Sequence, residues 1–188
     1  FAIVDGNSGK IYIDPDESTI TRFKEIKKTD DSQKSHLEEF RGKITVTRSG
    51  RKINLYANSG SLADIDLIKA SDAEGIGLFR SEYIFMQAHD YPTEDYQLDI
   101  YKNVLEQMEG KKVIIRTLDI GADKTAEYFM LKPEDNPAMG VRAIRLCLQN
   151  KAIFKTQLRA LYRASVYGNL SIMVPLITSV EEVLETKK

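Results

Sequence analysis

The chain has 188 residues, of which 42% are hydrophobic and 29% are charged, and its formal net charge is -1. This balance describes one globular domain, or one and a part, and gives no reason to expect binding to nucleic acid or to a membrane surface. The single cysteine excludes an internal disulfide framework, and no apolar run is long enough to cross a bilayer. We therefore expect a cytoplasmic protein with neither a nucleic-acid nor a membrane partner.

The chain begins with a predicted β-hairpin at residues 1–13, in which two short strands flank an Asp-Gly-Asn-Ser-Gly turn. A long helix is expected next, with Asp14 as its N-cap, Pro15 in its first position and an end near Phe40. The centre of this helix, residues 27–35, is wholly polar. A helix that is polar all round is typical of a solvated bridge between domains, although a plain surface helix gives the same pattern.

From residue 43 onward, predicted strands alternate with predicted helices. The expected strands are 44–47, 52–57, 75–79, 113–116 and 171–174. The expected helices are 61–70, 93–108, 140–148, 154–167 and one that begins at Ser179. Such alternation indicates parallel βα units, and about four of them would make half of an eightfold barrel.

Two of these strands end in the same way. In Gly-Ile-Gly-Leu-Phe-Arg-Ser-Glu at 75–82 and in Lys-Val-Ile-Ile-Arg-Thr-Leu-Asp-Ile-Gly at 112–121, an apolar run stops at an arginine, a hydroxyl and an acid. The carboxyl ends of parallel strands meet at one edge, so Arg80 and Arg116 are expected to lie there together. A guanidinium can bind a carboxylate or a phosphate through two parallel hydrogen bonds, and the pair predicts a site for a small ligand that carries both groups.

The alternative is that these arginines only form ion pairs with Glu82 and Asp119. We interpret the two acids as groups that orient the arginines, with simple ion pairing as the other possibility. Asn58 is expected to end the first barrel strand, predicted near 52–57, so its amide could reach the same edge, although it could equally be a cap or turn residue.

Three motifs carry a resemblance to a known family. The segments 75–82, 115–124 (Ile-Arg-Thr-Leu-Asp-Ile-Gly-Ala-Asp-Lys) and 136–145 (Asn-Pro-Ala-Met-Gly-Val-Arg-Ala-Ile-Arg) resemble the phosphoenolpyruvate-utilising enzymes, in particular the enzyme I group of the bacterial sugar phosphotransferase system. The motifs fall in the family's order, and the likeness covers essentially the whole chain.

The resemblance implies that the chain is a fragment with three parts. Residues 1–14 would be the tail of a phosphohistidine (swivelling) domain, residues 15–42 a helical linker, and residues 43–188 the N-terminal half of a TIM-type (β/α)8 barrel that binds phosphoenolpyruvate. Both ends of the chain fall inside predicted elements, as expected of a cut through a longer protein.

The implied function is transfer of the phosphoryl group of phosphoenolpyruvate to an enzyme histidine, and then to a small histidine-containing phosphocarrier protein in sugar uptake. The full-length protein is expected to be a homodimer. Two alternatives stay open: the barrel of pyruvate phosphate dikinase or phosphoenolpyruvate synthase, and a fragment that binds phosphoenolpyruvate without catalysis.

The resemblance also assigns site residues. Arg80 and Arg116 align with substrate-binding, catalytic arginines of the family, and Arg142 matches a third active-site arginine. Ala122 stands where the family usually has a second glycine, which affects the expected conformation of that loop.

No metal ligand is assigned within the chain, since the family's Mg²⁺ ligands belong to the second half of the barrel. The family's catalytic cysteine is also expected beyond Lys188, and Cys147 is interpreted as a packed apolar residue. His36 and His89 lack the setting of the phosphorylated histidine and are expected at the surface.

Overall fold

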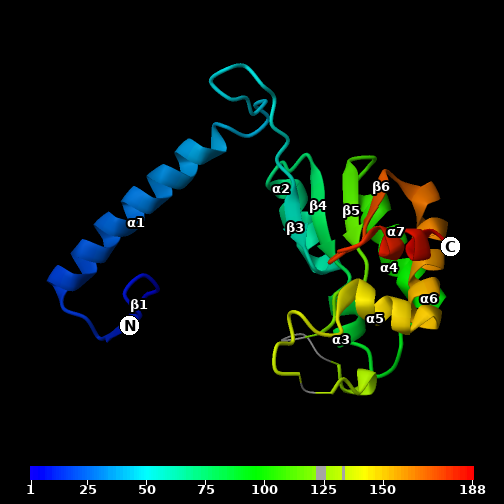
Figure 1. Ribbon diagram of the computed structural model, residues 1–188. Coiled ribbons are helices and arrows are strands. Elements are labelled where there is room, and N and C mark those ends of the chain that lie inside the picture. Colours follow the sequence, from blue (N-terminus) through cyan, green and yellow to red (C-terminus); the bar gives the residue numbers. More distant parts are fainter. Residues whose placement is uncertain (122–125, 133) are drawn as a thin grey trace. The chain divides into compact units, whose positions relative to one another are not determined.

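The computed structural model describes residues 1–121, 126–132 and 134–188, and it is drawn in Figure 1. Within these residues the chain forms two compact units, Phe1–Ile44 and Thr45–Lys188. The first contains a β-hairpin and a long helix, and the second contains a parallel sheet with its covering helices.

The hairpin of the first unit consists of β1 (Ala2–Asp5) and β2 (Lys10–Ile13), which pair antiparallel. The Asp5 carboxylate accepts a hydrogen bond from the Asn7 backbone N–H at 3.0 Å, and this bond holds the turn. The predicted hairpin is therefore present.

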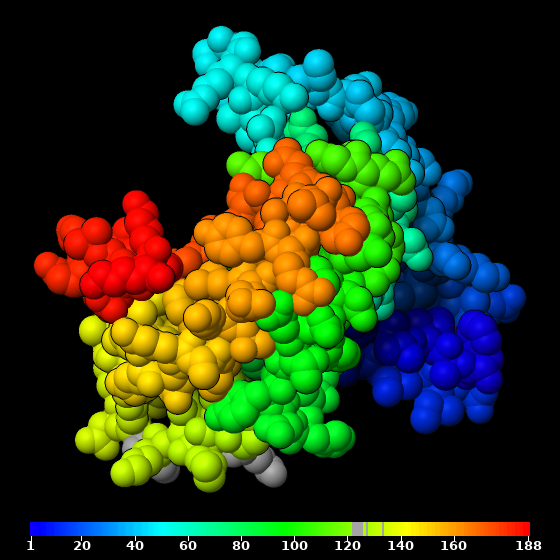
Figure 2. All heavy atoms as spheres, turned by 90° about the vertical axis from the view of Figure 1, so that its right-hand side faces the viewer, coloured from blue at the N-terminus to red at the C-terminus, as the bar shows by residue number. Residues whose placement is uncertain are grey.

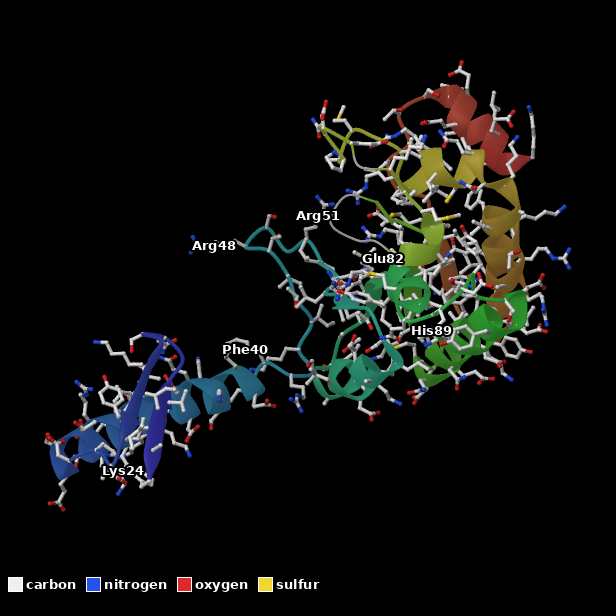
Figure 3. All side chains as sticks on the ribbon, turned by 90° about the horizontal axis from the view of Figure 1, so that it is seen from below. Lys24, Phe40, Arg48, Arg51, Glu82 and His89 are labelled. Carbon is white, nitrogen blue, oxygen red and sulfur yellow. The ribbon has the colours of Figure 1, made fainter. Side chains whose placement is uncertain are left out.

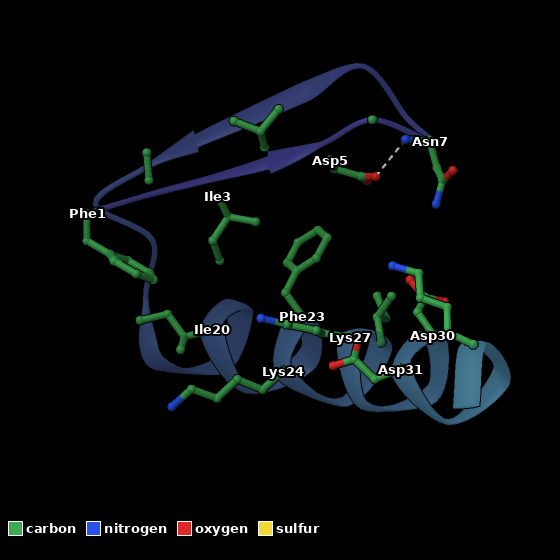
Figure 4. Close-up of a pocket in the computed structure, with 15 residues that line it drawn as sticks. Phe1, Ile3, Asp5, Asn7, Ile20, Phe23, Lys24, Lys27, Asp30 and Asp31 are labelled. Atoms are coloured by element: carbon green, nitrogen blue, oxygen red, sulfur yellow. Dashed lines mark hydrogen bonds between the residues drawn. The ribbon is translucent and has the colours of Figure 1, made fainter. Parts of the chain in front are cut away.

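Helix α1 (Glu17–Glu38) follows, with no buried residue along its length. Its N-cap is Asp16, whose side chain accepts from the Thr19 N–H at 2.7 Å. The prediction of Asp14 as N-cap was wrong, because Asp14 adopts a φ of 42° and pairs with the chain's terminal ammonium at 3.2 Å. Figure 4 shows apolar side chains of hairpin and helix, Phe23 among them, facing each other across a pocket of about 600 Å³.

The segment 45–56 differs from the prediction. Strands were expected at 44–47 and 52–57, but in the described residues this segment forms only a single bridge between Val46 and Lys52. The backbone of Leu55 bonds to Glu74 instead, through the Glu74 carboxylate at 2.7 Å and the Glu74 N–H at 2.9 Å. An alternating pattern forms a strand only where a partner strand is available, and here the first parallel strand begins later, at Ala57.

The sheet of the second unit is parallel and runs in chain order. Among the described residues it has four strands, β3 (Ala57–Ser59), β4 (Gly75–Arg80), β5 (Lys112–Arg116) and β6 (Leu170–Met173), in the order β3-β4-β5-β6. The strands expected at 75–79, 113–116 and 171–174 are confirmed.

Helices connect these strands. In the described residues they are α2 (Ile65–Ala70), α3 (Glu82–Met86), α4 (Glu94–Gln107), α5 (Ala143–Gln149), α6 (Lys151–Ala164) and α7 (Val180–Lys187), with 3₁₀ turns at Leu62–Asp64, Glu127–Phe129 and Ser165–Tyr167. Helices α4 and α7 begin where predicted, and their N-caps are Thr93 and Ser179, each of which accepts from the N–H three residues on. The short helix α3 was not predicted, and α5 and α6 begin three residues away from their expected starts.

Helices α4 and α6 cover one face of the sheet (Figure 1), and they pack beside each other, as the green and orange surfaces of Figure 2 show. The fully buried side chains between helices and sheet include Ile76, Phe79, Val113, Ile115, Tyr101, Val104 and Leu161. On the opposite face the strand residues Leu78, Ile114 and Ser171 are only half-buried. In the part of the chain that the structure describes, helices therefore cover one face of the sheet and leave the other uncovered, with the strand ends at the rim.

Candidate functional site

Arg80 and Arg116 are the last residues of β4 and β5, and they are register partners in the parallel pair. Partnered residues on neighbouring strands project from the same face of a sheet, so the two guanidinium groups leave the same face at the same edge. Met173, the last residue of β6, is the partner of Arg116 on its other side. The fold thus places both arginines at the carboxyl edge.

Arg116 is held by two acids. One Nη pairs with Glu82, whose side chain is fully buried inside the second unit (Figure 3), and the other Nη lies 3.1 Å from an Asp119 carboxylate oxygen. Glu82 is close to Arg80 in sequence, but it forms its ion pair with Arg116 of the neighbouring strand. The side chain of Arg116 is only 15% exposed, so these contacts fix the position of its guanidinium and offset much of its charge.

Asp119 also binds Arg142. The Arg142 Nε and Nη2 donate to one Asp119 oxygen at 3.2 and 2.8 Å, while the other oxygen faces Arg116. Gly121 permits this arrangement, because its φ is 133° and a Cβ there would lie 2.4 Å from the Arg142 Cβ. One carboxylate therefore joins the end of β5 to the residue that precedes α5.

Arg80 has different neighbours. Its Nη1 donates to the Tyr83 hydroxyl at 3.1 Å, and its guanidinium carbon lies 4.8 Å from the centre of the Tyr83 ring. In the described part of the chain no acid forms an ion pair with Arg80. Gly60 lies against this pair, since a Cβ at that position would be 2.6 Å from the Tyr83 ring and 3.3 Å from an Arg80 nitrogen. Arg80 is therefore positioned by an aromatic ring and keeps its charge.

The turn after β3 is fixed by Asp64. Its carboxylate accepts from the Ser59 hydroxyl at 3.1 Å and from the N–H groups of Gly60 at 3.0 Å and Ser61 at 3.1 Å. The Gly60 N–H, with these other donors, holds the pKa of Asp64 below its usual range. Asp64 therefore fixes the turn in which Gly60 lies against Tyr83.

Asn58 does not end its strand as expected, because Ser59 does. The register partner of Asn58 is Leu78, two residues before Arg80, so Asn58 lies further inward on the sheet than the arginines. Its side chain is exposed, and no hydrogen bond joins it to Arg80 or Arg116 in the described residues. A ligand-binding role for Asn58 stays a prediction.

The sequence analysis did not identify two residues near the site, Gly60 and Tyr83. In the sequence, Tyr83 is marked only by its position three residues after Arg80, and nothing distinguishes Gly60 from an ordinary turn glycine. Ala122, at the position where the family usually has a glycine, lies outside the described residues.

The remaining candidates lie away from the strand ends. Cys147 is buried, and its burial raises the pKa of the thiol to about 12, so it is a neutral packed side chain. His36 and His89 are exposed, His89 at the surface of the second unit (Figure 3). Across residues 1–121, 126–132 and 134–188 there is no group of three or more His, Cys, Asp or Glu side chains placed to hold a metal.

Among the described residues, three arginines and two acids therefore meet at this edge, and their three positive and two negative charges leave one positive charge. An excess of guanidinium groups over carboxylates has the chemistry suited to an anionic ligand. None of the described helices has the length and apolar character needed to cross a membrane.

Comparisons with known proteins show which family the chain resembles. Residues 34–188 match a family model described as PEP-utilising enzyme, PEP-binding domain. The chain is 46% identical over 185 residues to a phosphoenolpyruvate-protein phosphotransferase of Bacillus subtilis (strain 168), with 98% of the chain covered. It is 44% identical over 180 residues to one from Listeria innocua and 42% identical over 185 residues to one from Mycoplasma genitalium. The chain spans about a third of the length of these curated relatives, 32% in each case.

Proposed function

The chain belongs to the family of PEP-utilising enzymes, and on that premise we propose that its arginine-bearing strand ends form part of a phosphoenolpyruvate site in a phosphoenolpyruvate–protein phosphotransferase. The whole enzyme would pass the phosphoryl group to its own histidine and then to a small histidine-containing phosphocarrier protein. The observation that carries the proposal is the register pairing of Arg80 with Arg116 at the carboxyl edge of the sheet.

The chemistry of the ligand suits this edge. Phosphoenolpyruvate carries a phosphate and a carboxylate on a three-carbon frame, and each group can accept two parallel hydrogen bonds from a guanidinium. Phosphoryl transfer needs positioning and stabilisation of the charge on the oxygens of the moving group. Arg80 supplies charge that no described acid offsets, while Arg116 and Arg142 are held in place by their shared partner Asp119.

The described residues at this edge do not fit Mg²⁺. Their carboxylates, Glu82 and Asp119, already face guanidinium groups, and a divalent cation among three arginines would be repelled. We therefore assign no step to a metal here, and the expectation that the Mg²⁺ ligands belong to another part of the protein stays a prediction.

We further propose that the sheet is the first half of a (β/α)8 barrel, with residues 1–14 as the tail of a phosphohistidine domain and residues 15–42 as a linker. The consecutive order of β3, β4, β5 and β6, with a helix after each of the first three strands, supports the barrel. The uncovered face of the sheet would then line the barrel interior. The absence of buried residues along α1 supports the linker.

The alternative enzymes, pyruvate phosphate dikinase and phosphoenolpyruvate synthase, share this barrel. The printed names of the relatives favour the phosphotransferase. A fragment that only binds phosphoenolpyruvate is the remaining candidate, and it would bind the ligand equally well while forming no phosphohistidine.

Calorimetric titration with phosphoenolpyruvate, with and without Mg²⁺, tests the site in both the 188-residue chain and the full-length protein. We expect weak binding to the chain alone and tighter binding to the full-length protein, where labelled phosphoenolpyruvate should also yield phosphohistidine. Arg80→Ala should abolish the binding. Arg163→Ala is the matched control, because Arg163 pairs with Glu94 and Asp95 on the helix surface.

Equal affinity of wild type and Arg80→Ala for phosphoenolpyruvate would refute the site. Label on His36 or His89 of the isolated chain, or pyruvate released by it, would show that the catalytic parts had been misplaced. Binding without phosphohistidine in the full-length protein would favour the non-catalytic alternative.

A further inference from the structure

Buried side chains form a hydrogen-bonded chain behind the arginine-bearing strand ends. The Ser81 hydroxyl donates to the backbone carbonyl of Arg116 at 2.6 Å, and it accepts from the Gln157 Nε2 at 3.0 Å. The Gln157 Oε1 accepts from the backbone N–H of Leu118 at 2.9 Å. Ser81 and Gln157 are both fully buried, so these bonds are protected from water.

The chain of bonds continues away from the site into helix α4. The Gln157 Nε2 also donates to the Tyr101 hydroxyl at 3.1 Å, and that hydroxyl donates to the Gln97 Oε1 at 3.1 Å. The Gln97 Nε2 donates to the Pro92 carbonyl at 2.9 Å. Burial raises the pKa of Tyr101, so its hydroxyl stays protonated and remains a donor. The side-chain amides of Gln157 and Gln97 therefore each have a fixed orientation.

Packing alone does not require a glutamine at position 157. The neighbouring buried residues of α6 are apolar, including Phe154, Ala160 and Leu161, and burying an amide costs free energy unless its hydrogen bonds are satisfied. Besides its bond to Tyr101, Gln157 bonds to the turns after β4 and β5. Ser81 directly follows Arg80, and Leu118 directly precedes Asp119.

We propose that Gln157 is a positioning residue that sets the spacing between Arg80 and the Arg116–Asp119 pair, and that Ser81 is the link through which it acts. This inference rests on the proposed function. Gln157 touches no ligand, and its effect reaches the guanidinium groups through the backbone of two adjacent strand ends. A satisfied buried network of this kind holds its members in one arrangement.

The proposal distinguishes ligands that need both arginines from ligands that need one. Phosphoenolpyruvate has two anionic groups, so its affinity depends on the spacing of Arg80 and Arg116. Inorganic phosphate can be bound by a single guanidinium, so its affinity depends much less on that spacing. A purely structural role for Gln157 would change the affinity for both ligands together or for neither.

The test uses the full-length protein that contains this chain, with Gln157→Met compared to Gln97→Met. Both glutamines are fully buried, lie on helices and bond to Tyr101, but only Gln157 bonds to the strand-end turns. We expect similar losses of thermal stability for the two variants. Gln157→Met should weaken phosphoenolpyruvate binding about tenfold, the equivalent of one lost hydrogen bond, and phosphate binding less than about twofold. Gln97→Met should change neither affinity beyond about twofold.

Variants of Ser81 provide the second comparison, and they test the proposal even if Gln157→Met does not fold. Ser81→Thr keeps the hydroxyl and should retain wild-type affinity for phosphoenolpyruvate, whereas Ser81→Ala should reproduce the selective loss. Equal effects of Gln157→Met and Gln97→Met on phosphoenolpyruvate binding, or equal losses for both ligands, would overturn the proposal. A wild-type protein that fails to bind phosphoenolpyruvate would instead refute the proposed function.

Discussion

The ends of β4 and β5 carry the same order of residues, an arginine followed by a hydroxyl and then an acid, yet their arginines have different surroundings. Arg116 faces two carboxylates, Glu82 and Asp119. Arg80, its register partner, faces the ring and hydroxyl of Tyr83. Two similar motifs in neighbouring strands have thus produced one cation that is paired with acids and one that forms no ion pair within the described residues.

This difference has a physical reason. Two guanidinium groups that leave the same edge of a sheet repel each other, and the cost rises as water is excluded. Pairing Arg116 with acids lowers that cost and fixes its geometry, while the aromatic ring positions Arg80 without removing its charge. We infer that Arg116 contributes geometry and stability to the site, and that Arg80 contributes most of its attraction for an anion.

The largest expected effect is the loss of stability in Arg116→Ala. Removing this guanidinium leaves Glu82 and Asp119, whose side chains are 0% and 7% exposed, without their shared cation. Breaking such a buried pair typically costs about 3–5 kcal/mol. Urea unfolding of Arg116→Ala should show this loss, and adding Glu82→Gln should recover part of it. A cost below about 1 kcal/mol, the range of an exposed ion pair, would contradict the comparison.

Arg80→Ala should behave in the opposite way. Its contact with Tyr83 is worth about 0.5–1 kcal/mol of stability, but loss of a group that stabilises transition-state charge costs about 2.7–4 kcal/mol. Phosphoryl transfer by the full-length protein should therefore fall by about 10²–10³-fold with little change in the unfolding midpoint. Arg80→Lys should rescue poorly, because an ammonium cannot reproduce the planar fork. If Arg80→Ala transferred the phosphoryl group at a rate within a few-fold of wild type, Arg80 would have no role in the site.

The features that sequence alone could predict are those with local causes. Continuous apolar runs located the strands that end at Arg80 and Arg116, and the helix starts at Thr93 and Ser179 were predictable because each of these residues bonds to its own first turn. Parallel strands then require their carboxyl ends to share an edge, so the meeting of the two arginines was also predictable.

The features that could not be predicted depend on contacts between distant segments. Glu82 pairs across to Arg116, 34 residues away, and Gln157 reaches Ser81 across 76 residues. The strand expected at 52–57 begins only at Ala57 for the same reason, since the backbone N–H and carbonyl of Leu55 bond to Glu74 instead. No local sequence pattern predicts contacts between residues so far apart in the chain.

Gly60→Ala tests the difference between the two arginines, because it should disturb the surroundings of Arg80 and leave those of Arg116 unchanged. The new Cβ would lie 2.6 Å from the Tyr83 ring, and such overpacking typically costs about 1–3 kcal/mol. We expect weaker phosphoenolpyruvate binding in calorimetry, with partial recovery when Tyr83→Ala is added. Gly6→Ala is the control, since nothing lies within 4 Å of a Cβ there. Unchanged affinity in Gly60→Ala would show that Tyr83 does not position Arg80.

The protein's stability should depend on pH through Asp64, which lies in the turn next to Tyr83 and Arg80. Its pKa is lowered in the folded protein, first by the Gly60 N–H, so its contribution to stability is present above the ordinary value of about 4 and is lost as the pH falls through the folded pKa. Thermal unfolding between about pH 5 and pH 3 should therefore depend less on pH in Asp64→Asn than in wild type. Parallel pH profiles for the two proteins would contradict this.

Tyr83→Phe should have the smallest effect, and it separates the two ways in which Tyr83 holds Arg80. Phenylalanine keeps the ring under the guanidinium and removes only the hydroxyl that accepts from Arg80 at 3.1 Å. One such bond is worth about 0.5–1.5 kcal/mol, so the dissociation constant for phosphoenolpyruvate should rise by no more than about tenfold. Tyr83→Leu removes ring and hydroxyl together and should weaken binding further. If Tyr83→Phe weakens binding as much as Tyr83→Leu, the hydroxyl alone positions Arg80 and the stacked ring contributes nothing to the difference between the two strand ends.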